Sequence, residues 1–172
     1  MQLTLVDQEN KMKKKFLNLV EMHQGIIHKI LSVYTYNTED REDLLQEIML
    51  QLWKSFPGFR EKAAFSTWMY KVALNTALLH KRKKMKEKYT VDALIENRAQ
   101  QIGLSKDDIT ISLYMAIDQL GPIDKAIALL YLEQKSYQEI ENILGMKKNN
   151  IGVRISRIKD KLKKIFEYEQ QL

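Results

Sequence analysis

The apolar residues of this chain recur at steps of three and four positions through most of its length. Such steps place side chains on one face of an α-helix. Over residues 12–35 the series consists of Phe16, Leu19, Val20, His23, Ile27, Ile30 and Tyr34. The spacing therefore predicts a first amphipathic helix over 12–35.

A second helix is expected to begin at Asn37 or Thr38, because both residues are good N-caps and two acids follow them, where the helix dipole favours negative charge. Its expected apolar face consists of Leu45, Ile48, Met49, Leu52, Trp53 and Phe56. Pro57-Gly58 should end it.

A loop of mixed charge and aromatic residues, Phe59 to Ala64, separates the second helix from a third. The third helix begins near Ser66 and runs into a basic tail at Lys81. We expect it to bury Trp68, Met69, Val72, Ala73 and Leu79.

The periodic pattern weakens between residues 87 and 107, which predicts a linker. A second helical unit starts near residue 108, with helices expected over 109–119, 123–133, 136–143 and 148–166. Only two prolines and six glycines interrupt the 172 residues. The predicted fold class is therefore all-α, with two small helical domains, 1–86 and 108–172, joined by the linker.

The last two expected helices form a helix–turn–helix. Ser136 and Glu139 match a capping box at the start of the first, and Gly145 can adopt the left-handed conformation that ends it. The apolar series of the second helix is Ile151, Ile155, Ile158, Leu162 and Ile165. Another face carries Asn150, Arg154, Arg157, Lys161 and Lys164. Such a helix fits the major groove of DNA with its polar face toward the bases, although a basic face is also an ordinary solvated surface.

The charge of the chain favours a polyanionic partner. It carries 28 basic and 22 acidic residues, a net charge of +6. Residues 81–88 hold six basic residues and one acid, and residues 147–164 hold eight basic residues and one acid. Residues 39–47 instead hold five acids and one arginine. This distribution predicts two nucleic-acid contacts and one separate protein contact.

Several classes of site find no support in the sequence. There is no cysteine, and therefore no disulfide or thiolate metal site. His23 and His28 are five residues apart and do not share a helix face, so we expect His23 to be a core residue. Asp43 and Glu47 lack a convergent partner, and neither a phosphate-binding glycine loop nor a nucleophile motif occurs. We therefore expect no enzyme activity, no metal and no cofactor.

Neither a signal peptide nor an apolar run of the ~18 residues that a membrane span needs is evident. We expect a cytoplasmic protein.

Residues 56–75 interleave aromatic residues with Arg60, Lys62 and Lys71. Rings beside cations suit unpaired bases, which stack on the rings while the cations meet phosphates. The alternative is that these aromatics are core, because helical spacing alone explains Phe65 and Trp68.

Two segments resemble bacterial sigma factors of the extracytoplasmic-function group. Asp40-Arg-Glu-Asp-Leu-Leu-Gln-Glu47, then Phe65-Ser-Thr-Trp-Met-Tyr-Lys-Val-Ala-Leu-Asn75 and the basic tail, resemble region two. Leu120-Gly-Pro-Ile-Asp to Leu162 resembles region four. The resemblance covers most of the chain, in the family's order. It implies a transcription initiation factor whose partners are RNA polymerase core, through its clamp and flap, promoter DNA and an anti-sigma factor.

The resemblance also implies site residues. The polymerase clamp helices would contact Asp43, Gln46, Glu47 and Leu50. The −10 element would be bound by the loop 59–64 and the third helix, through Phe59, Arg60, Lys62, Lys71, Asn75, Lys81 and Arg82. The −35 element would be bound by the helix–turn–helix, through Lys147, Lys148, Asn149, Asn150, Arg154, Arg157 and Lys161.

This chain departs from the family pattern at a few of these positions. Lys147 stands where a serine cap is common, and Asn149 and Asn150 replace a common glycine and threonine. Gly152 replaces a polar residue, at a cost to helix stability of ~1 kcal/mol against alanine. Leu79 replaces a common acid. These differences bear on the promoter sequence rather than on the class of protein.

Other functions stay open at this point. The first is a helix–turn–helix regulator or adaptor, or a decoy for an anti-sigma factor, that does not support initiation. A nucleic-acid-processing enzyme is a weaker alternative, since no acid, base and metal set converges. The acidic flank and the aromatic loop distinguish these possibilities, because a plain DNA-binding regulator needs neither.

Overall fold

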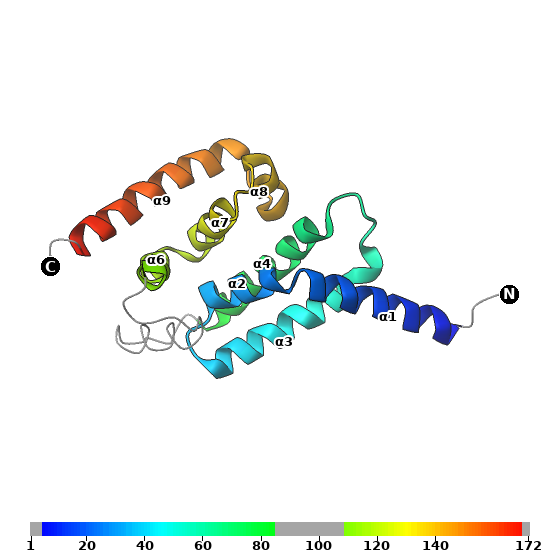
Figure 1. Ribbon diagram of the computed structural model, residues 1–172. Helices are drawn as coiled ribbons and strands as arrows, with labels where there is room; N and C mark the ends of the chain where they lie inside the picture. The colour runs from blue at the N-terminus through cyan, green and yellow to red at the C-terminus, as the bar shows by residue number, and fades with distance from the viewer. Residues whose placement is uncertain (1–4, 85–108, 170–172) are drawn as a thin grey trace.

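The computed structural model describes residues 5–84 and 109–169, where every regular element is a helix (Figure 1), as predicted for an all-α protein. The predicted linker 87–107 lies outside the described residues. The elements in chain order are α1 (Leu5–Met22), α2 (Gln24–Tyr34), α3 (Thr38–Ser55), the short 3₁₀ helix η1 (Phe56–Gly58), α4 (Phe65–Lys83), α6 (Ile109–Asp118), α7 (Pro122–Leu132), α8 (Tyr137–Leu144) and α9 (Lys148–Glu169).

The helix predicted over 12–35 is wrong as a single element, because the chain breaks at His23. The backbone of His23 leaves the helical region (φ −118°, ψ 14°), and its N–H donates to the carbonyl of Val20, three residues back, at 3.1 Å. Gly25 follows directly, and glycine is a poor helix former. His23 itself is half-buried, and its ring lies 5.2 Å from that of Phe65.

Helix α3 begins at its predicted cap, since the Asn37 side chain accepts from the N–H of Asp40 at 2.7 Å. Its buried stripe is Leu44, Ile48 and Leu52, each 0% exposed. The prediction that Leu45 is buried is wrong. Leu45 lies about 100° around the helix from Leu44, outside the stripe, and is 37% exposed.

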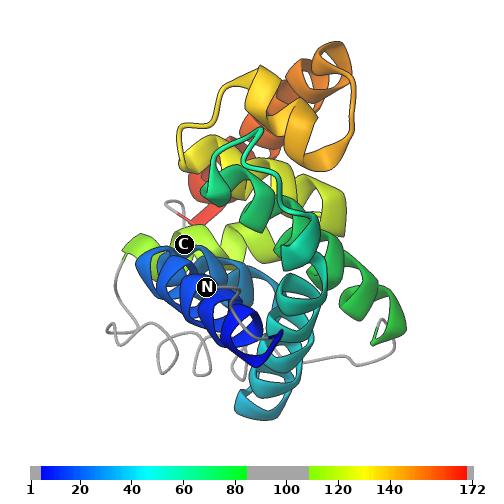
Figure 2. The same ribbon diagram turned by 90° about the vertical axis from the view of Figure 1, so that its right-hand side faces the viewer.

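Helix α4 packs against both α2 and α3 (Figure 2). It buries Met69 and Ala73, while Trp68 and Val72 are partly buried, all four as predicted for the core. The prediction for Leu79 is wrong. This side chain is 56% exposed because it projects to the open side of α4.

The helix–turn–helix prediction is confirmed in its local detail. Ser136 and Glu139 form both halves of the capping box, and Gly145 ends α8 in the left-handed region with φ 69°. Helix α9 then buries Ile151, Ile155 and Ile158.

The α6–α9 part of the chain packs on the α1–α4 part, as Figures 1 and 2 show from two directions. The hydroxyl of Tyr34 donates to the carbonyl of Pro122 at 2.7 Å, and Lys29 pairs with Glu133 at 2.6 Å. Burial, followed by the neighbouring Tyr36, raises the pKa of Tyr34. Its phenol therefore stays protonated and keeps its role as donor.

Lys125 carries a buried charge at this interface. Its residue is 4% exposed, and its Nζ lies 2.8 Å from both the Asp118 carboxylate and the Tyr36 hydroxyl. Asp118 belongs to the same part of the chain as Lys125, whereas Tyr36 belongs to the other. One ammonium group thus ties the two parts together.

A second charged cluster fixes α4 to α3. Asp40, 5% exposed, accepts from the His80 Nε2 at 2.7 Å and pairs with the Lys84 Nζ at 2.8 Å. Burial opposes ionisation of Asp40, but hydrogen bonds from Lys84 and His80 outweigh it, so the pKa of Asp40 is below its ordinary value. The hydrogen bond that Lys84 donates to Asp40 also raises the pKa of Lys84.

Replacing Lys125 is expected to destabilise the chain strongly. Lys125→Met leaves the Asp118 carboxylate, whose side chain is 6% exposed, without its cation. Removing one partner of a buried pair commonly costs about 3–5 kcal/mol. Urea unfolding should show this loss, and the double variant Lys125→Met/Asp118→Leu should recover most of it. A single variant as stable as the wild type would contradict the role of this charge.

The Asp40 cluster is expected to make stability dependent on acid pH. Because the pKa of Asp40 is lowered by folding, its contribution is complete at neutral pH and disappears as the pH falls below about 4, where the carboxylate takes up a proton. Asp40→Asn should therefore reduce the free energy of unfolding at pH 7 by about 1.5–3 kcal/mol, and the difference from wild type should shrink in acid. Urea unfolding at several pH values measures this. Glu42→Gln, an exposed acid on the same helix, is the control.

Candidate functional site

The residues predicted for polymerase contact lie together on one exposed side of α3. Asp43, Gln46 and Leu50 are exposed, and the Glu47 side chain is 41% exposed. Their spacing of three, one and three residues aligns them along the helix. The flank they form, called here the acidic flank, combines two carboxylates, an amide and an exposed leucine.

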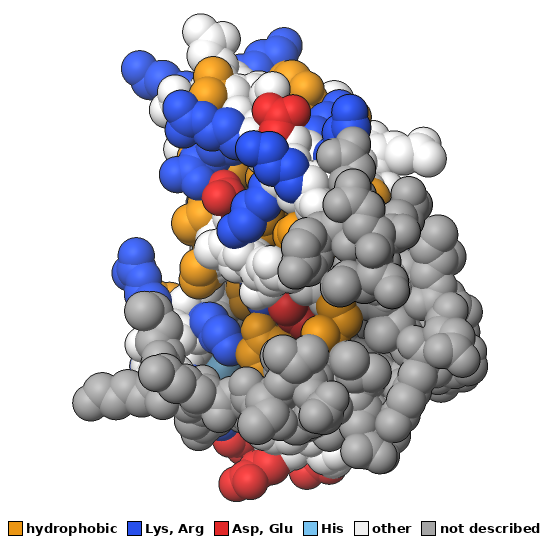
Figure 3. Space-filling model, turned by 90° about the vertical axis from the view of Figure 1, so that its left-hand side faces the viewer, with side chains coloured by type: hydrophobic (Ala, Val, Ile, Leu, Met, Phe, Trp, Pro, Cys, Tyr) orange, Lys and Arg blue, Asp and Glu red, His pale blue; other side chains and the backbone are white. Residues whose placement is uncertain are grey.

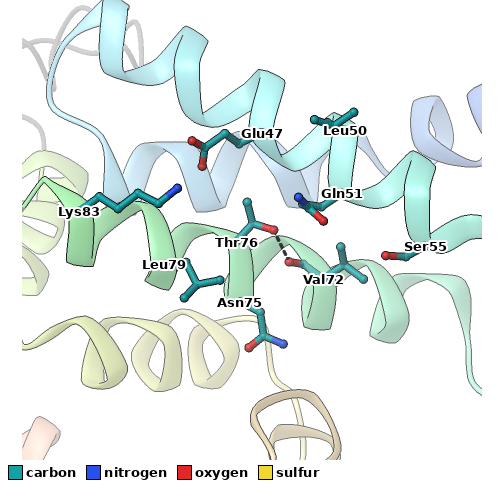
Figure 4. A pocket seen from close by; sticks show the side chains of 9 residues that line it. All are labelled: Glu47, Leu50, Gln51, Ser55, Val72, Asn75, Thr76, Leu79 and Lys83. Atoms are coloured by element: carbon teal, nitrogen blue, oxygen red, sulfur yellow. Dashed lines mark hydrogen bonds between the residues drawn. The ribbon is translucent and has the colours of Figure 1, made fainter.

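A shallow groove runs beside the acidic flank, between α3 and α4 (Figure 4). Leu50 and Leu79 are 50% and 56% exposed on its two sides, and Glu47 and Lys83 flank the same groove. Its remaining lining residues are Gln51, Ser55, Val72, Asn75 and Thr76. The sequence did not indicate this groove, because its two leucines are 29 positions apart.

The aromatic loop is anchored at Phe59 and at Glu61. Phe59 is half-buried, and its ring lies 5.1 Å from that of Trp68 and 5.5 Å from that of Phe65. Glu61 has a left-handed backbone, φ 55°, and pairs with Lys15 of α1 at 2.7 Å. The structure thus holds the Phe59 ring within an aromatic cluster, so the ring cannot stack fully on a base without leaving its neighbours.

The cations of the loop and of α4 remain accessible. Arg60 and Lys62 are exposed beside Phe59. Lys71, Asn75 and Arg82 are also exposed and follow one line along α4, at steps of four and seven. Lys81 is different.

The Lys81 ammonium lies 4.2 Å from the centre of the Tyr36 ring, and its side chain is half-buried. Such a cation–π contact is worth ~0.5–2 kcal/mol. Lys81 would therefore have to leave Tyr36, the ring that also meets Lys125, before it could reach a phosphate.

The start of α9 presents a continuous polar surface. Lys147, Lys148, Asn149, Asn150 and Arg157 are all exposed. Figure 3 shows Lys and Arg side chains gathered on the upper part of the face on which α9 lies.

Two of the predicted −35 residues are already bonded within the protein. Arg154 donates to Asp124 of α7 at 2.6 Å, and the Lys161 Nζ donates to the carbonyl of Gln119 at 2.6 Å. Arg154 would have to break its pair to reach a base edge. Arg157, one turn later, is exposed.

Val153 is a surface residue that the sequence reasoning missed. It is 52% exposed and lies on the outward face of α9 between Asn149, Asn150 and Arg157. The pattern that could have revealed it is its position opposite the buried Ile151 and Ile155.

Within residues 5–84 and 109–169, no three His, Asp or Glu residues are grouped to hold a metal ion. No helix in the same ranges has the length and apolar character needed to cross a membrane.

Comparison with known protein families gives two matches in the order expected for a single two-part factor. Residues 19–87 match the family described as Sigma-70 region 2, and residues 110–162 match Sigma-70, region 4. The first match contains the acidic flank, the aromatic loop and α4, and the second contains the helix–turn–helix.

Characterised relatives match along almost the whole chain. The RNA polymerase sigma-H factor of Pseudomonas aeruginosa is 26% identical over 172 residues, covering 90% of this chain and 88% of the relative. The ECF RNA polymerase sigma factor SigW of Bacillus subtilis is 29% identical over 164 residues, covering 87% of each.

Among solved structures, the fold resembles the sigma factor RpoE of Bartonella quintana, crystallised with the anti-sigma factor NepR. The TM-score is 0.63 at 16% identity, over 90% of this chain and 96% of that one. Two family matches in sequence and this shared fold lead to one assignment. The chain belongs to the sigma-70 family, within its ECF group of transcription initiation factors.

Proposed function

We propose that the chain binds RNA polymerase core through the acidic flank and directs it to promoters whose −10 and −35 elements it reads with separate surfaces. The observation that carries this proposal is the arrangement of charge. One exposed helix side presents Asp43 and Glu47, whereas the cations of α4 and α9 lie on other surfaces. A factor that joins a protein to a polyanion needs this separation.

The two surfaces divide along the chain. Residues 1–86 form the domain for core polymerase and the −10 element, and residues 108–172 form the domain for the −35 element. The polymerase clamp meets the acidic flank, and the flap meets the C-terminal domain. The chain has no catalytic role of its own, acts in the cytoplasm and needs no cofactor. Similarity to a sigma factor solved with an anti-sigma factor supports control by such a partner.

The −10 element is held by Arg60, Lys62, Lys71, Asn75 and Arg82, whose exposed side chains follow the loop and one side of α4. Lys81 joins them once it leaves Tyr36. Phe59 supports the loop from within the aromatic cluster and offers its exposed edge to an unpaired base.

For the −35 element, Asn149, Asn150 and Arg157 face outward and contact base edges, because asparagine pairs with adenine and arginine with guanine in the major groove. Lys147, Lys148 and Lys161 meet phosphates. Arg154 chiefly braces α9 against α7 through Asp124.

The broad test is transcription in vitro with purified core polymerase on a pool of random promoters. Enrichment of templates that share one −10 and one −35 motif supports the proposal. Binding of DNA without transcription would instead identify a regulator that does not support initiation.

Reversing the acidic flank is expected to weaken core binding. Asp43→Lys/Glu47→Lys replaces two exposed negative charges by positive ones, and the loss of paired interface charges commonly costs ~2–5 kcal/mol. Titration of a fluorescently labelled chain with core polymerase measures the affinity. Glu21→Lys, an exposed acid of α1 that lies outside the acidic flank, should have little effect. Equal losses in the two variants would count against a specific contact.

Val153 is expected to contact the methyl group of a thymine in the −35 element, because it is the apolar side chain in the middle of the base-facing surface of α9. Replacing thymine by uracil, one position at a time, should lower affinity about fourfold at one position, as one buried methyl is worth about 0.8 kcal/mol. Val153→Ala should remove the difference between the two bases, whereas Val153→Thr, which keeps a methyl group, should retain it. Lys164→Ala is the control, since a phosphate contact weakens both templates alike. A thymine preference that survives Val153→Ala would exclude this contact.

A further inference from the structure

His80 lies between the proposed polymerase surface on α3 and the proposed −10 surface on α4. It is in the last turn of α4, directly before Lys81 and Arg82. Only 4% of it is exposed. A histidine this buried has its orientation fixed by its neighbours, so its contacts define what it can do.

The ring bridges two carboxylates of α3. Its Nε2 lies 2.7 Å from the Oδ1 of Asp40, and its Nδ1 lies 3.3 Å from the Oε2 of Glu47. These acids are seven residues apart and therefore on one side of the helix. Asp40 is buried and also held by Lys84, whereas Glu47 belongs to the acidic flank.

Ionised carboxylates only accept hydrogen bonds, so the ring satisfies both of them only when both of its nitrogens carry protons. A neutral ring has one N–H. The shorter bond to the buried Asp40 retains that proton on Nε2, and Nδ1 then presents a lone pair to Glu47. Loss of one proton thus releases Glu47 and leaves Asp40 in place.

The charged groups that contact the ring or its two carboxylates come from α3 and from the end of α4. Asp40 and Glu47 come from α3, and Lys84, from the end of α4, shares the Asp40 carboxylate and also meets Asp43. On α2, which packs on the other side of α4, the charged groups bond elsewhere: Lys29 with Glu133, and His28 with Arg41.

We infer that His80 is a positioning residue that holds the Glu47 carboxylate, through its Nδ1, in the orientation in which polymerase core binds it. The inference rests on the proposed function, since it assigns Glu47 to the polymerase contact. Glu47 is held before binding, so the complex loses less side-chain freedom when it forms. Release of Glu47 should lower core affinity while the fold remains intact.

Two variants separate the two bonds of the ring. The amide nitrogen of asparagine occupies the place of Nδ1, so His80→Asn keeps a donor toward Glu47. The amide nitrogen of glutamine occupies the place of Nε2, so His80→Gln keeps the donor toward Asp40 and releases Glu47.

The experiment is titration of the labelled full-length chain with core polymerase at neutral pH. His80→Gln should bind about two- to tenfold more weakly than the wild type, from the ordering of one long side chain. His80→Asn should bind as tightly as the wild type. In a Glu47→Ala background the two variants should bind alike, because the side chain that the ring holds is gone. His23→Gln, at a histidine between α1 and α2, should bind as the wild type does.

Thermal unfolding of both variants identifies any loss of affinity that arises from misfolding.

A folded His80→Gln variant that binds core polymerase as tightly as the wild type, or as His80→Asn, overturns the inference. If the Asp43/Glu47 reversal weakens binding under those conditions, the proposed function stands and only the role of His80 is wrong. If the reversal has no effect, the polymerase contact itself is misplaced and the inference fails with it.

Discussion

Helix α4 forms packing contacts with three neighbours at once, and the rest of the structure depends on these contacts. It packs against α2, α3 and the helix–turn–helix part of the chain. Its buried residues, Phe65, Met69, Tyr70, Ala73, Leu74, Thr76, Ala77 and His80, occupy about half of its circumference. The other half carries its exposed residues, and Lys71, Asn75 and Arg82 lie along one line there. The proposed DNA contacts of α4 are therefore confined to the side that burial leaves free.

Charge at two buried points completes this packing. Asp40 and His80 join α4 to α3, and Lys125 joins α7 to the loop after α2 through Tyr36. Asp40 and Lys125 are charged groups with very little exposure, and loss of a partner leaves such a group uncompensated. The Tyr36 ring contacts Lys125 of α7 and also Lys81 of α4. A change in the packing between the α6–α9 part and the α1–α4 part therefore alters the surroundings of Lys81, a proposed DNA contact.

Much of the fold could be predicted because its determinants are local. The Asn37 cap, the Ser136–Glu139 capping box and the left-handed Gly145 each depend on residues within a few positions of one another. The break at His23 was not predicted, because the apolar period continues across it. Periodicity indicates which face of a helix is buried, not whether the helix is continuous. The bridges Asp40–His80 and Tyr36–Lys125 were not predicted, because 40 and 89 positions separate their members. A single polar residue in a sequence does not indicate which distant residue it will contact. The same limit applies to Arg154, whose pairing with Asp124 depends on how α7 and α9 cross. The site residues named from the family resemblance are located by the structure, and their roles are for experiment to decide.

The left-handed backbone of Glu61 has a consequence for how such factors diversify. The curve of the loop 59–64 is set by one unusual backbone angle, by the pair with Lys15 and by the aromatic rings at its base. None of these uses the side chains of Arg60, Lys62 or Ala63, which are exposed. Substitutions at these three positions can accumulate without disturbing the shape of the loop, whereas Phe59, Glu61 and Lys15, which determine that shape, stay constrained. The proposed −10 contact of the loop can therefore change in sequence among related chains, through substitutions that leave folding unaffected.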